Sequence, residues 1–479
     1  MRYQLILLLC ILFGLSAKAQ SQADSSLTLS DSELYALVLR NHPMVKQAGL
    51  LEEQGKQEVR GARGNFDPKI EASWNQKIFE DKEYYDILNA KLKIPTWLPI
   101  DPTLSVDRNE GVYLNNERFI SEDYNYWQLA TGLSVPIGRG LFIDQRRAAV
   151  QEANYYRNQL QAEQVARTNK VLLQVTKDYW EWYFAWHEWH QLGISIGISR
   201  EIADRTVQNW SLGEAALIDT VQASITWQTR RIEYNEAAIN LARASLQLSV
   251  HLWNDEGQPL ELKPEVRPPD FENLQGPEPE PGLDSLRQYA IVQHPDLLKL
   301  IAKGEQLDVM RRLAGENIKP TLNLNYYFIN TPFSPNGGEP NYALDQNYKL
   351  GVDFSIPLFL RKERAKLQMS RLKIQDNDYE LSHARLRVEN TLRATYKEWE
   401  TVSQLLGMQL QAMRSYEALL QAELLNLDFG ESDLFKINYQ QDKLIQARLK
   451  YLKLQARLHK VRMQLRYDTG YPMLNIIAQ

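Results

Sequence analysis

The chain has 479 residues, 24% of them charged, and its formal net charge at pH 7 is −5. A mildly acidic chain of this kind gives no reason to expect a nucleic acid as partner. Its only cysteine, Cys10, lies in the N-terminal apolar run, which excludes disulfides and thiolate metal sites from the rest of the chain.

Residues 1–19 have the features of a secretory signal peptide. Arg2 precedes an apolar run over residues 5–15, and residues 17–19 place small side chains at cleavage spacing. We therefore expect the mature chain to begin near Gln20 and to function outside the cytoplasm. No later segment reaches the ~18 consecutive apolar residues of a spanning helix, so any membrane crossing would have to use strands.

The chain contains an internal repeat. His42-Pro43 recurs as His294-Pro295 at an offset of 252 residues, and further along the chain the offset settles at 217. Residues 20–254 and 282–479 thus form two copies of one unit. Segment 255–281, with seven prolines, joins them as a stiff linker or an irregular belt. Other matching pairs are Pro68 and Pro320, Arg147 and Arg364, Tyr179 and Tyr396, and Trp182 and Trp399.

Each copy begins with two short helices separated by a His-Pro break. Ser30 and Glu33 have the spacing of a capping box at the start of the first helix. His42-Pro43 ends one helix and starts the next, because proline disfavours helix in the residue before it but fits the first helical turn. The second copy repeats this pattern from Asp284 to His294-Pro295.

Four strands follow from an alternation of period two, at residues 69–79, 124–136, 321–330 and 347–357. Each is close to the ~9–11 residues that cross a bilayer, although a soluble sandwich would give a similar pattern. We expect the polar face of these strands to line a lumen; its members include Lys69, Glu71, Asn323, Asn325, Lys349 and Asp353.

The first copy has 31 extra residues between its strands, within about residues 80–122. This loop is too long for a simple turn. We expect it to form an extracellular cap or to extend the strands, and a disordered insert is the alternative.

Four helices are expected at 141–209, 214–254, 361–428 and 431–468, in stretches that contain no proline. A helix of about 69 residues is roughly 100 Å long at ~1.5 Å per residue, so such helices must pack side by side as coiled-coil partners. Gly213 and Gly430 mark the turns, since glycine is the expected stop after a helix.

Four strands cannot close a barrel alone, and open sheet edges in lipid would leave backbone groups without hydrogen bonds. The protomers must therefore assemble. Two copies would give eight strands with a filled interior, whereas three give twelve with room for a lumen, which favours a trimer.

Residues 179–190 form the densest aromatic run of the chain and surround their helix, which indicates packing; a surface for apolar substrates or a partner is the alternative. His187 and His190 lack the second histidine of a His-Glu-x-x-His zinc motif at the required spacing. No phosphate loop, nucleophile elbow or metal-ligand pattern is present in the sequence, so neither an enzyme nor a cofactor is indicated.

The sequence resembles the TolC-like outer membrane efflux protein family over nearly all its mature length. The paired His-Pro motifs, the strand ends at 134–136 and 355–357, and the turns at Gly213 and Gly430 carry the resemblance. It implies an α+β membrane protein in which four strands per protomer contribute to a trimeric, twelve-stranded barrel, continued by a long periplasmic coiled-coil tunnel.

The resemblance also implies location and partners. The protein would lie in the outer membrane of a Gram-negative bacterium, extend into the periplasm, and serve as a passive exit duct. Its partners would be a periplasmic adaptor and an inner-membrane pump of the RND, ABC or MFS type, and the duct would serve efflux or type I secretion.

Relatives often narrow the periplasmic entrance with acidic residues after the second turn glycine, and this chain departs from that pattern. Lys436 and Tyr439 occupy those positions, whereas Asp219 matches in the first copy. We expect a mixed-charge constriction around Asp219 and Lys436, with Glu431, Asp433 and Glu214 nearby. Ordinary solvated charges at helix ends are the alternative.

Two other function classes remain open from the sequence. A periplasmic adaptor or structural protein without a pore would share the long helical hairpins but not the amphipathic strands. An enzyme on a helical scaffold has no site residues to support it.

Overall fold

The computed structural model describes residues 28–111, 113–114, 119, 125–270, 280–331, 333, 346–429 and 431–473. The expected signal peptide and Gly430 lie outside these residues. The chain divides into two compact units, Met1–Leu50 with Glu163–Leu297 and Ala384–Gln479, and Leu51–Ala162 with Leu298–His383. Each unit takes segments from both sequence copies, because the longest helix of each copy belongs partly to one unit and partly to the other.

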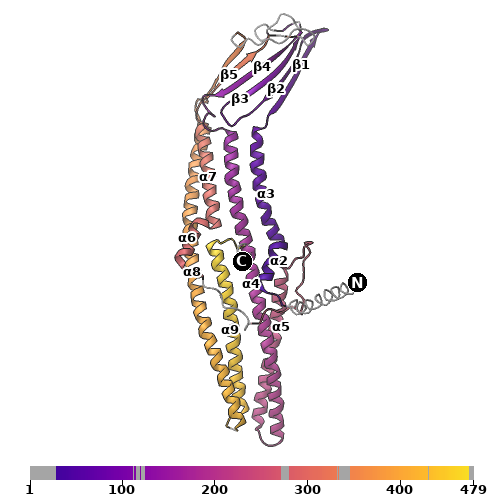
Figure 1. Cartoon of the computed structure of the whole chain (residues 1–479), viewed down its shortest axis with the longest axis vertical. Coiled ribbons are helices and arrows are strands. Elements are labelled where there is room, and N and C mark those ends of the chain that lie inside the picture. The colour runs from indigo at the N-terminus through magenta and orange to yellow at the C-terminus, as the bar shows by residue number, and fades with distance from the viewer. Residues whose placement is uncertain are drawn as a thin grey trace, which may run out of the picture. The chain divides into compact units, whose positions relative to one another are not determined.

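Figure 1 labels the helices. The first copy has α2 (Asp31–Asn41), α3 (Pro43–Arg63), the short 3₁₀ helix η2 (Gly64–Phe66), α4 (Gln145–Ser211) and α5 (Leu217–Ser249). The second has α6 (Leu283–Gln293), α7 (Pro295–Glu316), α8 (Arg361–Asp428) and α9 (Leu434–Thr469). Among the described residues, none of these helices combines the length and apolar character needed to cross a membrane.

The helix starts and breaks follow the expected local chemistry. The Ser30 hydroxyl accepts a hydrogen bond from the backbone N–H of Glu33 (3.3 Å), and the Glu33 carboxylate accepts one from the Ser30 N–H (3.0 Å). His42 and His294 are both extended, with ψ of 126° and 125°, so each His-Pro pair interrupts the helix in the same way.

The strands form one antiparallel six-stranded sheet in the order β1-β2-β3-β4-β5-β6. Figure 1 labels β1 to β5, which lie side by side. Their bounds are β1 Lys69–Phe79, β2 Lys82–Lys93, β3 Asp101–Glu110, β4 Asn125–Pro136, β5 Thr321–Ile329 and β6 Tyr348–Ser355.

The expected four strands are corrected to six, because β2 and β3 occupy most of the stretch 80–122 that the sequence assigns to a loop. Two features of the sequence explain why these strands are not predicted from it. Lysines at 91 and 93 make β2 polar toward its end, and Pro102 in β3 is a residue that argues against a strand interior. Pro102 is tolerated because it is only the second residue of β3.

The register gives the sheet one apolar and one polar face. In one row across all six strands, neighbouring partners are Ile70, Leu92, Leu104, Thr131, Phe328 and Tyr348. The row one residue along is Lys69, Lys93, Thr103, Gly132, Tyr327 and Lys349. The two faces therefore continue through β2 and β3 without a change of phase.

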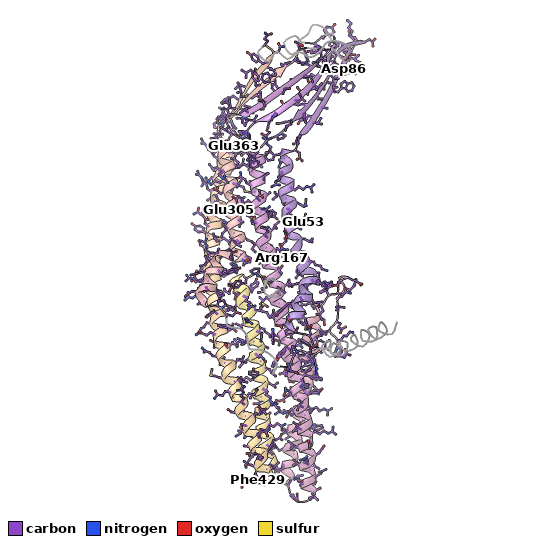
Figure 2. The ribbon with its side chains drawn as sticks, in the orientation of Figure 1. Glu53, Asp86, Arg167, Glu305, Glu363 and Phe429 are labelled. Carbon is purple, nitrogen blue, oxygen red and sulfur yellow. The ribbon has the colours of Figure 1, made fainter. Side chains whose placement is uncertain are left out.

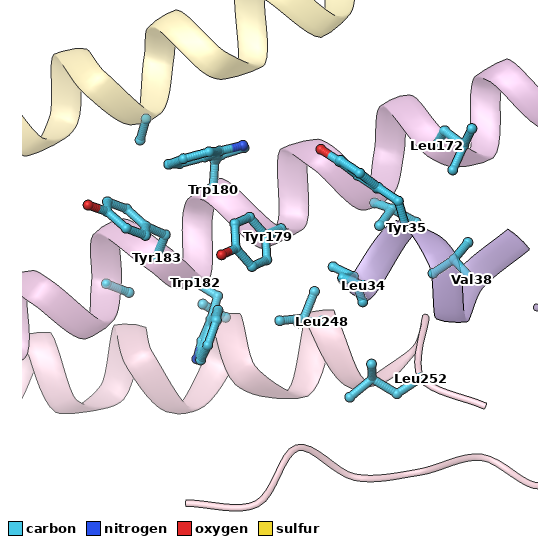
Figure 3. Packing of buried hydrophobic residues seen from close by; sticks show 14 of the residues in the cluster. Leu34, Tyr35, Val38, Leu172, Tyr179, Trp180, Trp182, Tyr183, Leu248 and Leu252 are labelled. Carbon is cyan, nitrogen blue, oxygen red and sulfur yellow. The ribbon is translucent and has the colours of Figure 1, made fainter. Parts of the chain in front are cut away.

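The main core of the first unit contains part of the aromatic run (Figure 3). Tyr179, Trp180, Trp182 and Tyr183 are each at most 2% exposed. They belong to one cluster with side chains from α2, α5 and α9, namely Leu34, Val38, Leu248 and Leu452. The packing interpretation is confirmed for these four aromatic residues.

The described part of the segment between the copies lies on this core as an irregular belt. Leu262 and Val266 pack against the cluster, and the Leu29 N–H donates to the Arg267 carbonyl (3.0 Å). The carboxylate of Glu280, whose side chain is only 5% exposed, accepts from Arg462 on α9 (2.5 Å).

A chain of polar groups is buried where α2, α4 and α5 meet. The Met44 N–H donates to His42 Nδ1 (3.2 Å), His42 Nε2 lies 3.4 Å from His251 Nδ1, and His251 Nε2 lies 2.7 Å from Asp178. With both imidazoles neutral, every ring nitrogen has a partner. In the second copy Thr395 and Asp468 replace Asp178 and His251, and the Thr395 hydroxyl donates to Asp468 (2.6 Å).

We expect acid to weaken the fold through His42. Burial, with a smaller contribution from His251, lowers the pKa of His42 from 6.5 to about 4. The unfolded chain therefore binds the proton that the folded chain excludes, so the stability associated with the neutral ring is present above pH 6.5 and is lost as pH falls toward 4. Between pH 7 and pH 5 this amounts to at most about 2 kcal/mol.

The measurement is the thermal midpoint at pH 7 and pH 5. His42→Gln should reduce the difference between the two values without abolishing it, because burial also lowers the pKa of His187 and of His459 to about 4. Substitution of the exposed His383 on α8 by glutamine should leave the difference unchanged. An unchanged pH dependence in His42→Gln would refute this role.

Candidate functional site

The ends of the two long hairpins in the first unit are the candidate site. α4 ends at Ser211 and α5 begins at Leu217, and Gly213 between them has φ of 78°, the left-handed conformation expected of its glycine. The Glu214 N–H donates to the Asn209 carbonyl (2.8 Å), and Glu431 makes the same bond to Asn426 (2.8 Å). The two turns therefore share a closing hydrogen bond 217 residues apart.

Two of the expected entrance residues cap the helices that leave these turns. The Asp219 carboxylate accepts from the Ala216 N–H (3.1 Å) near the start of α5. The Asp433 carboxylate accepts from the Lys436 N–H (2.8 Å) at the start of α9. Negative charge at a helix N-terminus is stabilised by the free N–H groups there, so both carboxylates have a structural role as well as a charge.

A cavity of about 810 Å³ lies between the two hairpins. Asp219 and Asp433 both line it, together with Tyr439. Lys436, Glu214 and Glu431 are exposed at the helix ends and are not part of the cavity wall. The structure thus brings two acidic candidates to one cavity and places the other three outside it.

Arg230 and Asp442 form an ion pair that joins α5 to α9 across this cavity. Their side chains are 14% and 26% exposed. Arg230 also pairs with Glu233 on its own helix (2.5 Å), and Asp442 accepts from Gln446 (2.8 Å). The pair therefore lies in a partly buried network that holds the two hairpins to each other.

Sequence reasoning missed this pair, although the repeat carries a signal for it. At the offset of 217, Arg230 corresponds to Ala447 and Asp442 corresponds to Ile225. Each partner is thus a charge where the other copy has an apolar side chain. On α5, buried alanines recur every seven residues at Ala223, Ala237 and Ala244, and Arg230 takes the place of an alanine between the first two.

Large apolar side chains are exposed beside the turns. Phe429, labelled in Figure 2, is 79% exposed at the end of α8. Phe435 and Tyr439 at the start of α9 are 60% and 53% exposed.

The expected lumen residues all lie on the polar face of the sheet. Asn325 joins two of its neighbours, because it accepts from the Ser134 hydroxyl (2.7 Å) and donates to Asp353 (2.6 Å). Gly132 on this face is required by packing, since a Cβ there would lie 2.0 Å from the ring of Tyr327. Lys69, Glu71, Asn323 and Lys349 occupy positions in phase with these residues.

A cluster of three carboxylates lies at the end of the sheet near the β1–β2 turn. Glu83, Asp86 and Glu110 have oxygens within 4.8 Å of one another. Arg108 pairs with Asp86 (2.8 Å) and Glu110 (3.5 Å), and Trp74 Nε1 donates to Asp86 (2.8 Å). The Arg108 guanidinium offsets one of the three negative charges and holds Asp86 and Glu110 in an ion-pair network.

Comparisons with known proteins agree on one architecture. Residues 286–470 match the family model for outer membrane efflux proteins. No curated protein sequence matches the chain. The described fold resembles three outer-membrane proteins of known structure: the CmeC channel of Campylobacter jejuni (14% identity, TM-score 0.61, 93% of this chain and 88% of that one), VceC of Vibrio cholerae (13%, 0.60, 92% and 96%), and the open MtrE channel of Neisseria gonorrhoeae (13%, 0.60, 92% and 88%).

We expect Arg230→Gln to loosen the hairpin ends, because it breaks the link between α5 and α9 and leaves the Asp442 carboxylate without its partner. Amide hydrogen exchange near the starts of both helices should rise about fivefold, which corresponds to about 1 kcal/mol. Arg205→Gln is the matched control, because it breaks a solvent-exposed ion pair with Glu201 (2.6 Å) within α4. Equal exchange in both variants would contradict the linking role.

Proposed function

We propose that the chain is one protomer of an outer-membrane exit duct. The starting point is the match of residues 286–470 to the outer membrane efflux protein model. The duct would extend into the periplasm of a Gram-negative cell and receive substrates from a pump that spans the periplasm. It moves them without chemical change, so catalysis is not part of this function.

One observation carries the proposal: a single amphipathic sheet joined to helices of 67 and 68 residues. Among the described residues no helix layer covers the apolar face of the sheet, and Ile70, Trp74 and Phe354 are 80%, 61% and 65% exposed. Exposed apolar surface on this scale marks a contact with lipid or another chain. A periplasmic adaptor without a pore would have no use for it.

The two edges of the sheet determine what must complete it. β1 and β6 are the terminal strands, so each presents one row of backbone groups beyond the sheet. In hydrocarbon these groups must find hydrogen-bond partners, and a second copy of the chain supplies the complementary edge. We therefore infer that β1 of one copy pairs with β6 of the next until the ring closes.

The number of copies needs a separate argument. With six strands per copy, two copies already contain twelve strands, so strand counting no longer favours three copies over two. The proposal of a homotrimer rests on the resemblance to TolC-like proteins.

A stripe on α5 supports assembly through the helices as well. Its members recur every seven residues and are 58–72% exposed: Ile218, Ile225, Ile232, Ile239 and Leu246. A seven-residue apolar repeat is the pattern of a coiled-coil seam. The inward alanine series forms a different seam on the same helix. Ile225 of the stripe also lines the cavity between the hairpins, so the part of the stripe farther from the turn is the part available to a neighbour.

The polar face of the sheet would then line the lumen, and the cavity with Asp219 and Asp433 would lie at the periplasmic entrance. Lys436, Glu214 and Glu431 add exposed charges of both signs at the hairpin ends. The exposed hairpin ends are where a periplasmic adaptor would meet the duct. An RND, ABC or MFS pump in the inner membrane would determine what is exported.

We expect a charge in the α5 stripe to disrupt the oligomer. Ile232→Asp would place a carboxylate in the seam between copies, where it loses hydration without gaining a partner. The mass of the purified protein in detergent should fall from that of the oligomer to that of one chain. Asn240→Asp, at an exposed position rotated by about 100° from Ile239 around α5, controls for the added charge and should leave the oligomer intact. An intact oligomer in Ile232→Asp would exclude the stripe from the interface.

We expect the entrance charges to set ion selectivity. Asp219→Asn keeps an oxygen for the Ala216 N–H but removes the charge, so single channels should become less cation-selective, by about twofold. Lys436→Gln should shift selectivity toward cations. Glu236→Gln, exposed elsewhere on α5, is the control. If neither variant changes selectivity or gating, these residues do not lie at the constriction.

A further inference from the structure

We propose that the β2–β3 hairpin is part of the membrane wall rather than an external loop, so that each protomer contributes six strands to a widened barrel. This inference rests on the proposed function and adds to it the composition of the wall and the width of the pore.

The hydrogen-bonded ladders show that the hairpin runs along the full length of its neighbours. β2 pairs with β1 from Lys69–Lys93 at one end to Phe79–Lys82 at the other. β3 pairs with β4 from Asp101–Ser134 to the far end at Glu110. With 12 and 10 residues, β2 and β3 are as long as strands that cross a bilayer.

The turn between β2 and β3, residues 94–100, lies at the end of the sheet to which the helices connect. Trp97 in this turn contacts Phe66 of η2, with ring centroids 5.4 Å apart. Arg146 at the start of α4 pairs with Asp101 (3.0 Å). The chain therefore crosses the whole sheet in β2 and crosses back in β3, which a cap on the outer side would not do.

Up to the Asp86–Arg108 ion pair near its outer end, the hairpin presents the same two faces as the rest of the sheet. On the apolar face, Leu88, Ala90, Leu92, Leu104 and Val106 continue the rows that begin on β1. On the polar face, Asn89 donates to Asp107, and the Lys91 ammonium lies 5.9 Å from the ring centre of Tyr327 on β5. A side chain from the hairpin thus contacts one from the second sequence repeat of the same chain, on the polar face.

Apolar side chains also gather in the turn, where Trp97 and Leu98 are 52% and 64% exposed. Tryptophan at the ends of membrane strands is favoured at the headgroup level, because its ring is apolar and its N–H is polar. The turn therefore fits the periplasmic interface of the bilayer.

The width of the barrel follows from the strand number. Diameter grows roughly linearly with the number of strands, so six strands per copy instead of four make the ring about 1.5 times as wide. With three copies the wall has 18 strands, a size at which barrels enclose an aqueous channel. The outer pore would thus pass larger cargo than a twelve-stranded one.

Spin labels on single cysteines test this placement in lipid vesicles, after Cys10→Ser in the full chain. Leu88→Cys and Ala90→Cys report on the apolar face of β2, and Lys91→Cys reports on its polar face. Leu350→Cys and Lys349→Cys are the matched references on β6. We expect labels at 88, 90 and 350 to collide roughly threefold more with lipid-soluble oxygen than with a water-soluble nickel complex, and labels at 91 and 349 to show the reverse.

The possible outcomes distinguish a failure of this inference from a failure of the proposed function on which it rests. A lipid-exposed label at 350 with water-exposed labels at 88 and 90 would overturn the hairpin's place in the wall while leaving the duct intact. A water-exposed label at 350 would remove the membrane sheet itself, and with it the proposed function. Ala90→Cys, the smaller change, keeps the test decisive if Leu88→Cys fails to assemble.

Discussion

In the part of the chain that the structure describes, the outer edges of β1 and β6 have no neighbouring strand, and the proposed assembly follows from this constraint. Within one protomer, each inner strand of the sheet has a neighbouring strand on both sides, whereas each of the two terminal strands has one. In water such edges could be solvated, but beside the exposed apolar face of this sheet they would meet hydrocarbon, where each unbonded N–H or C=O costs several kcal/mol. Only a partner with the same strand spacing satisfies a whole edge, and a second copy has that spacing.

The helices would also contact neighbouring protomers, through apolar side chains rather than backbone hydrogen bonds. α5 places small alanines toward its own chain, which allows close approach, and larger isoleucines on another side, where the structure leaves them exposed. Arg230 interrupts the alanine series and pairs with Asp442, so a charge joins the hairpins near the place where they turn. A helix with two seams suits a closed ring of helices, since each helix in such a ring has a neighbour on either side.

The sequence allowed accurate prediction where local chemistry decides the structure. α8 spans the expected residues 361–428, since no proline interrupts it, and β6 follows the strict alternation from Tyr348 to Ser355. β2 and β3 escaped prediction because pairing on both sides stabilises strands whose own pattern is weak, such as the polar end of β2. Of the entrance residues, Asp219 and Asp433 lie at one cavity, but the Arg230–Asp442 pair depends on how two hairpins pack, which no local pattern encodes.

The two copies of the repeat differ in the sheet, in the buried polar groups and near the hairpin ends. The first has an extra pair of strands, a buried His251–Asp178 pair where the second has Asp468 and Thr395, and Arg230 where the second has alanine.

Electron microscopy of the purified protein in lipid nanodiscs tests the central claim most directly. The account predicts a closed ring in which β1 of each copy pairs with β6 of the next. Single chains with both edges open, or a ring joined through other strands, would contradict it.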